Sequence, residues 1–151
     1  MEYNHEAYTE AYAKEKKLGF LVASSWKSML AEIQIASAGA DSYLVADYDE
    51  SSTFSSNHDD ALLEYRTYSV YFITKLEAGS YHTVPKAKHA ARLSADAFVR
   101  RLLRDSSKGY NGLRNLLFES IGISSLGMIA DWKFGVVVTF TLVGGFAYVD
   151  E

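Results

Sequence analysis

Histidine can act as a general base or a metal ligand, so the four histidines of this sequence are the first candidates for chemistry. They are scattered along the chain, at His5, His58, His82 and His89. No pair has the helical i, i+4 spacing with an intervening glutamate that a zinc-protease helix requires. The closest acidic neighbours are Asp59 and Asp60, in the segment NHDD, which could hold a divalent ion or support hydrolysis. Adjacent side chains of an extended loop diverge, however, so we expect NHDD to be a solvated loop.

Other catalytic signatures are missing from the sequence. The chain has no cysteine, which excludes disulfides, thiolate nucleophiles and cysteine-ligated zinc. It contains no glycine-rich phosphate loop and no GxSxG nucleophile turn, and the segment LVGGFAY lacks the helix that a phosphate-binding loop would precede. No serine has a histidine–aspartate pair that spacing would reveal. We therefore expect no catalytic residue, no metal and no cofactor, and predict that the chain is not an enzyme.

The charged residues are divided between two blocks. Residues 41–64 hold seven acidic and no basic residues, whereas residues 86–114 hold eight basic and two acidic ones. Each block is either a solvated face or one half of a contact. The interpretation we carry forward is that the basic block of one copy faces the acidic block of the next. The candidates for this subunit interface are Lys86, Arg100, Arg101 and Arg104 on the basic side, and Asp47, Asp49, Glu50, Asp59 and Asp60 on the acidic side.

A basic helix face could instead bind nucleic-acid phosphates. The net charge of −4 argues against bulk attraction to nucleic acid, and an acidic inner surface would let DNA pass without sticking. Tyrosine, with 11 residues, offers a further contact surface because it is enriched at interfaces. Tyr3, Tyr8 and Tyr12 stud the polar segment 1–17, which either projects as an arm or packs on a neighbour. These three are the candidates for contacts with a partner; alternatively, the tyrosines line a small sheet.

A single domain spanning residues 1–151 has to position these side chains. An apolar stripe with a period of 3.6 predicts a helix over residues 5–31. The stripe consists of Leu18, Val22, Trp26, Met29 and Ile33. Whether the helix continues or a hairpin begins near Ile33 stays open. Strands are predicted over residues 42–48 and 63–76, separated by a Ser/Asp-rich loop over residues 49–60.

Pro85 begins a second predicted helix, over residues 85–105. Its expected buried face is Ala91, Ala95, Phe98, Val99 and Leu102. A strand is predicted over residues 121–129, and another within the apolar C-terminal run. That run is uncharged for 16 residues from Phe134, fewer than the roughly 20 of a membrane-spanning helix.

β-Branched residues and alternation identify this last run as a long strand instead. One face is fully apolar, with Val136, Val138, Phe140 and Leu142. We expect a bend or bulge at Gly144–Gly145 and no contact with a membrane. The order helix, two strands, helix, two strands predicts an α+β fold: a mainly antiparallel sheet with an N-terminal helix and a second helix packed on one face.

This order of elements, carried by YRTYSVYFITKL, AARLSADAFVRRLLRD and WKFGVVVTFTLV, resembles the small neck proteins of tailed bacteriophages. These are the tail terminator and tail-completion proteins that join head to tail, and the resemblance covers residues 10–143. It implies a non-enzymatic structural subunit of the virion, assembled in the host cytoplasm, that forms a homo-oligomeric ring such as a hexamer or dodecamer. DNA would pass through the ring without specific binding, and adjacent neck and tail proteins would contact it.

The N-terminal segment and GGFAYVDE depart from the pattern of these neck proteins. Terminator, completion protein and other ring component therefore stay open as alternatives. The alternative function is a protein-binding adaptor module, which would use the Tyr-rich arm and the Arg-rich helix face.

Overall fold

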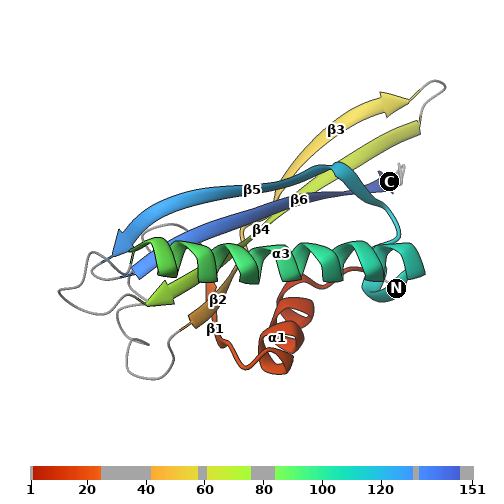
Figure 1. The fold of residues 1–151 in the computed structure, drawn as a ribbon. Helices are drawn as coiled ribbons and strands as arrows, with labels where there is room; N and C mark the ends of the chain where they lie inside the picture. Colours follow the sequence, from red (N-terminus) through yellow and green to blue (C-terminus); the bar gives the residue numbers. More distant parts are fainter. Residues whose placement is uncertain (1, 25–41, 58–60, 76–83, 131–132, 147–151) are drawn as a thin grey trace.

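A six-stranded, mostly antiparallel sheet carries two α-helices on one face in the described part of the chain (Figure 1). The structure is a computed structural model, and it describes residues 2–24, 42–57, 61–75, 84–130 and 133–146. The elements are α1 (His5–Glu15), β1 (Gly19–Ala23), β2 (Ser42–Asp47), β3 (Ser51–Asn57), β4 (Ala61–Lys75), α3 (Val84–Lys108), the 3₁₀ turn η2 (Tyr110–Gly112), β5 (Leu116–Ala130) and β6 (Lys133–Phe146). The predicted α+β class, with both predicted helices on one face of an antiparallel sheet, is confirmed.

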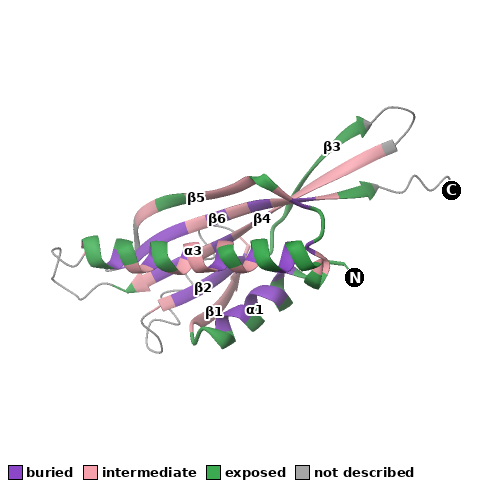
Figure 2. Cartoon of the chain, turned by 45° about the vertical axis from the view of Figure 1, so that its right-hand side comes forward, coloured by how far each residue is buried: buried purple, intermediate pink, exposed green. Residues whose placement is uncertain are grey.

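The strands lie in the order β1-β2-β4-β6-β5, and β3 pairs with β4 beside this path. Of the strand pairs in the described part of the chain, β1–β2 is parallel and the others are antiparallel. β6 occupies one edge of β4 along nearly its whole length, and the other edge is shared: β2 pairs with its C-terminal part and β3 with its N-terminal part. As a result β3, the start of β4 and the end of β6 extend beyond the helices (Figures 1 and 2). We call these three segments the sheet extension.

α3 crosses the sheet over β4 and β6 with a narrow buried face. The small side chains of Ala87, Ala91 and Ala95 let the helix approach the strands closely, and Phe98 and Leu102 fill the space beyond them. This is the predicted face, except that the predicted member Val99 is only half-buried.

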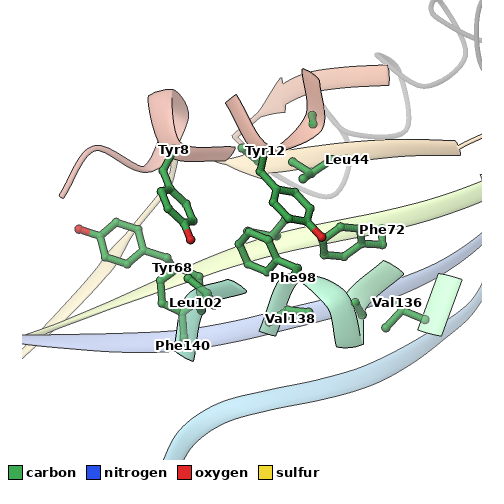
Figure 3. Close-up of a cluster of buried hydrophobic side chains, with 14 of the residues drawn as sticks. Tyr8, Tyr12, Leu44, Tyr68, Phe72, Phe98, Leu102, Val136, Val138 and Phe140 are labelled. Atoms are coloured by element: carbon green, nitrogen blue, oxygen red, sulfur yellow. The ribbon is translucent and has the colours of Figure 1, made fainter. Parts of the chain in front are cut away.

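Phe98 is the centre of the core, and its ring is fully buried (Figure 3). On the sheet side its centroid lies 5.5 Å from that of Phe72 and 6.3 Å from that of Phe140. On the other side it meets the rings of Tyr12, at 5.1 Å, and Tyr8, at 6.2 Å, which come from α1. Edge-on and tilted contacts of this kind are favourable for aromatic pairs. Phe98 therefore joins α1, α3 and the sheet in one core.

The helix predicted over residues 5–31 is wrong over residues 16–24, because α1 ends at Glu15 and β1 follows. The N–H of Leu18 donates to the carbonyl of Ala13 at 2.9 Å, and Lys17 has a φ of 57°. This pattern closes a helix, although glycine usually takes the left-handed position. The apolar stripe was therefore misleading: Val22 lies in a strand, and the remaining members from Trp26 onward lie outside the described residues.

The Ser/Asp-rich segment predicted as a loop over residues 49–60 contains strand β3. Its residues pair with β4 in an unbroken antiparallel register from Ser51 opposite Thr67 to Asn57 opposite Ala61. The prediction was wrong because serine and aspartate suggest loops by composition, whereas β3 is formed by ladder hydrogen bonds to its neighbour. His58, Asp59 and Asp60 lie outside the described residues.

The predicted C-terminal strand is confirmed, and its apolar face is buried against the helices. Of the bend or bulge expected at Gly144–Gly145, the bulge is wrong, since both glycines pair in register with β4. β5 starts before the predicted residue 121 and carries a register shift between Leu117 and Gly122. In that shift the Ser120 hydroxyl donates to the Leu117 carbonyl at 2.6 Å and accepts the Thr141 N–H at 2.9 Å. Among the described residues, no helix is long and apolar enough to span a membrane.

Replacing Phe98 with alanine should remove the ring that joins both helices to the sheet. We expect a loss of about 3–5 kcal/mol in the free energy of unfolding, from lost burial and the cavity that remains. Leu93→Ala, on the same helix but half-exposed, is the control and should change it by no more than about 0.5 kcal/mol. Urea unfolding followed by circular dichroism measures both. Equal losses in the two variants would contradict this account of the core.

Candidate functional site

The arginines singled out from the sequence differ in their partners within the chain. Arg101 forms a two-pronged ion pair with Glu15 of α1, at 2.7 and 2.8 Å, and its guanidinium lies over the Tyr12 ring. The hydrogen bond to Glu15 raises the pKa of Arg101 above its ordinary value, so the guanidinium stays charged. Because its side chain is only 18% exposed, Arg101 mainly fastens α1 to α3.

Arg104 lies beside a buried carboxylate. Asp105 is 4% exposed and accepts a hydrogen bond from the Tyr8 hydroxyl at 2.8 Å. The Arg104 guanidinium contacts the other carboxylate oxygen at 3.4 Å and remains 56% exposed. Burial, and then the bond to Asp105, raise the pKa of Tyr8 well above its ordinary value, so the hydroxyl remains a donor. The carboxylate of Asp105 is thus compensated from two sides, and Arg104 keeps part of its charge at the surface.

The outward side of α3 carries the remaining candidate cations of the sequence analysis. Lys86, Leu93 and Arg100 recur every seven residues, and Arg104 follows one turn later, so all four lie opposite the buried face. Lys86 and Arg100 are exposed, and neither has an acidic partner among the described residues. Leu93 is 50% exposed between them. We call Lys86, Leu93, Arg100 and Arg104 the outer basic ridge. The seven-residue spacing would have included Leu93, but a search for charged residues alone did not find it.

The acidic candidates lie where β2 passes into β3. One carboxylate oxygen of Asp47 accepts the Asp49 N–H at 2.9 Å, and the other faces the Tyr71 hydroxyl at 3.5 Å. Desolvation raises the pKa of Asp47 above its ordinary value. Asp49 and Glu50 are exposed. The candidates Asp59 and Asp60 lie outside the described residues.

A groove brings these acids together with α1. It has a volume of about 260 Å³, and three carboxylates line it, from Glu6, Asp47 and Glu50. Aromatic rings from Tyr3, Tyr48 and Tyr68 also line it. We call this hollow the acidic groove. Glu6 could not be assigned to it from sequence, because it belongs to α1 and lies far along the chain from the other two acids.

Among the described residues, Arg66 is the one arginine that lines the acidic groove, and it is already paired within the chain. It forms ion pairs with Glu64, beside it on β4, and with Glu2, at 3.2 Å. The hydrogen bond to Glu64 is the main cause that raises the Arg66 pKa. Tyr68 bonds to Glu50, and burial together with that bond raises the pKa of Tyr68 to about 12. The groove therefore presents net negative charge and, at Tyr3 and Tyr68, hydroxyls whose pKa burial raises.

His5 also lines the groove, yet both of its ring nitrogens are engaged. Nε2 lies 3.0 Å from the Ser69 carbonyl, which can only accept, so Nε2 carries the proton. Nδ1, 2.8 Å from the Tyr3 hydroxyl, is then the acceptor. Burial lowers the pKa of His5 despite opposing effects of the Ser69 carbonyl and Glu50. This neutral ring has no lone pair left for a metal or a substrate proton. Its hydrogen bonds instead connect the N-terminal segment to β4.

The tyrosine candidates of the N-terminal segment are used inside the chain. Tyr12 is 3% and Tyr8 9% exposed, and both pack in the core against Phe98 (Figure 3). Tyr3 is half-buried, with its ring 5.1 Å from that of Tyr68. The structure thus corrects the expectation of a projecting arm over residues 1–17, because residues 2–17 lie on the body of the domain. The four-residue spacing of Tyr8 and Tyr12 could have shown this, because it places both side chains on the same face of a helix.

Tyr8→Phe should lower the free energy of unfolding by roughly 1–3 kcal/mol, because the buried Asp105 carboxylate loses a hydrogen bond while the ring stays in place. Tyr12→Phe is the matched control. The Tyr12 hydroxyl has no hydrogen-bond partner in the described part of the chain, so we expect a change within about 0.5 kcal/mol. Chemical unfolding at pH 7 compares the two. A Tyr12 effect as large as that of Tyr8 would argue against the Tyr8–Asp105 bond.

Stability should fall as the pH drops below 6.5, the ordinary pKa of histidine. His5 has a lowered pKa in the folded chain, so the unfolded state is protonated first on acidification. The free energy of unfolding therefore decreases until the pH reaches the pKa of His5 in the folded chain. Protonation of Nδ1 would also remove the acceptor for Tyr3. His5→Gln should flatten the decline in unfolding free energy between pH 7 and pH 5, measured by urea titration at each pH. An unchanged slope would show that other groups cause it.

Comparison with known proteins gives no relative from which a function could be transferred. No protein-family model matches the chain, and no curated protein sequence matches it. The function therefore has to be inferred from the outer basic ridge, the acidic groove and the sheet that carries them.

Proposed function

We propose that the chain is a non-enzymatic structural subunit that assembles with copies of itself into a ring, as in the neck or tail of a tailed-phage virion. One observation carries this proposal: the outer basic ridge and the acidic groove are both present, and neither neutralises the other within the described chain. Lys86 and Arg100 have no acidic partner there, and the groove holds three carboxylates around an arginine that is already paired. Complementary surfaces that stay unpaired within one copy can pair between copies.

The symmetry of such a contact supports a ring. The ridge and the groove are different surfaces, so a ridge-to-groove contact is heterologous and leaves a free ridge and a free groove on each pair. Copies then add until the rotation between neighbours closes the assembly. Leu93 gives the ridge an apolar centre flanked by cations, and Tyr48, 57% exposed, gives the groove an aromatic rim. Apolar contact inside a charged rim is the usual composition of a protein interface.

The fold is compatible with the element order of the phage neck proteins that the sequence resembles. An N-terminal helix, antiparallel strands, a helix crossing the sheet and a closing strand pair are all present. The ring would lie around the DNA channel of the virion and contact adjacent neck and tail proteins. The net charge of −4 would repel a passing duplex.

The alternative, an adaptor module that binds partners through a Tyr-rich arm and the arginine face, has less support. Tyr8 and Tyr12 are core residues, and Arg101 is held by Glu15. Only the outer basic ridge would remain for such an adaptor. A stable one-to-one complex with another protein would favour it.

Native mass spectrometry of the purified chain tests the ring. We expect assemblies of defined stoichiometry, and Arg100→Glu should weaken assembly roughly tenfold or more by placing a carboxylate against the acidic groove. Combining Arg100→Glu with Glu50→Arg should restore part of the loss. Lys75→Glu is the matched control, because it makes the same charge change at an exposed end of β4. Monomers at every concentration, also with neighbouring particle proteins present, would contradict the proposal.

A further inference from the structure

The carboxylates that line the acidic groove are held apart from one another. One oxygen of Asp47 faces the Tyr71 hydroxyl at 3.5 Å. Glu50 bonds instead to the hydroxyl of Tyr68. Tyr68 and Tyr71 are three positions apart on β4, so their side chains lie on opposite faces of the sheet. The acids therefore stand at separate points, and the described residues contain no group of three such side chains close enough to hold one metal ion.

Asp47 has no cationic partner among the described residues. Its carboxylate faces the Asp49 N–H and the Tyr71 hydroxyl, and none of the ion pairs formed by described residues includes it. The side chain is half-buried, and desolvation raises its pKa. A carboxylate that is partly removed from water and has no counter-ion is stabilised when a cation binds beside it.

Aromatic rings give the same groove an apolar lining. The ring of Tyr3 lies edge-on to that of Tyr68, with 5.1 Å between the centroids. Tyr48 forms the exposed rim, and Val22 and Ala46 add aliphatic surface. The face of a tyrosine ring attracts an ammonium group, and apolar surface accommodates a chain of methylene groups. The groove thus combines separated carboxylates with a lining that suits the aliphatic part of an organic cation.

The size of the groove limits the ligand to a small one. A volume of about 260 Å³ lies below the range of roughly 300–1,000 Å³ that drug-sized molecules occupy. We propose that the acidic groove binds a linear aliphatic diamine of about four carbons, with one ammonium group at Asp47, the other at Glu50 and the methylene groups against the tyrosine rings. Glu6 adds a third carboxylate from α1.

Such a ligand would resemble the surface that the ring places in the groove. Arg100 and Arg104 of the outer basic ridge are one turn apart on α3, a rise of about 6 Å along the helix. The two ammonium groups of a four-carbon diamine have a similar separation. A diamine would therefore compete with the ridge of a neighbouring copy and regulate assembly. This competition rests on the proposed function, whereas the binding itself does not.

Isothermal titration calorimetry with 1,4-diaminobutane tests the site. The full chain carries Arg100→Glu, so that the ridge of a neighbour does not fill the groove. We expect saturable binding at one site, and roughly tenfold weaker binding of 1-aminobutane, which has the same chain and only one charge. Magnesium chloride at the same ionic strength should not displace the diamine. Equal affinity for the two amines, displacement by magnesium, or no saturable binding would overturn the proposal.

Substitutions that remove one charge locate the diamine in the groove. In the same background, Glu50→Gln and Asp47→Asn should each weaken binding roughly fivefold or more, because each keeps a side-chain oxygen and loses the charge. Glu119→Gln is the matched control, since it removes the same charge at an exposed position of β5 that does not line the groove. Circular dichroism checks that each variant is folded. An equal effect of Glu119→Gln would indicate bulk charge attraction and contradict the site.

Native mass spectrometry of the wild-type chain separates this proposal from the ring. We expect 1,4-diaminobutane to shift the assemblies towards monomers. Diamine binding by a wild-type chain that is always monomeric would refute the ring and leave the diamine site standing. Assembly of the wild-type chain, without diamine binding by the Arg100→Glu variant, would refute the site and leave the ring. Assemblies that persist at saturating diamine would overturn the competition.

Discussion

The contact of the Phe98 ring with both α1 and the sheet is the constraint on which the other surfaces depend. α1 lies against β1 and β2 and reaches the centre of the core through Tyr8 and Tyr12, whose rings contact that of Phe98. Two polar links, from Tyr8 to Asp105 and from Arg101 to Glu15, then fix the helix against α3. Burial of aromatic surface supplies the stability, and the polar links set the orientation. The position of α1 in turn decides where Glu6 stands, and hence whether an acidic groove exists.

The parts of the fold in which the local sequence pattern agrees with the tertiary packing were predictable. The alternation from Val136 to Leu142 and the spacing of Ala91, Ala95 and Phe98 correspond directly to buried faces. The wrong predictions concern segments whose structure is determined by pairing with a neighbouring strand or by a residue in an unusual backbone conformation. Lys17 takes a left-handed conformation that glycine usually occupies at the end of a helix. Because no glycine stands at that position, the end of α1 could not be recognised in the sequence. Likewise β3 became a strand through its ladder with β4, and its serines carry no such signal.

The candidate site was predictable at the level of charge and unpredictable at the level of pairing. Arg100, Arg101 and Arg104 are equivalent in a linear reading, yet one is exposed, one is bound to Glu15 and one touches a buried carboxylate. The partner of Arg101 lies 86 positions away in the chain, a separation that no helical spacing can reveal. The same holds for the acidic groove, which needs α1 and the end of β2 in one place. Sequence thus located the charged segments, and only the fold distinguished structural ion pairs from surface available to a partner.

β4 and β6 run side by side through both the body and the sheet extension, paired over the 14 residues of β6. The far end of the extension is therefore built from the same two strands as the core. A pull on that end along the strand direction would load the whole ladder in shear, with its hydrogen bonds sharing the force, instead of opening them one after another. Tension applied to that end would pass into the packed layer under α3, because no break in the β4–β6 ladder separates the two.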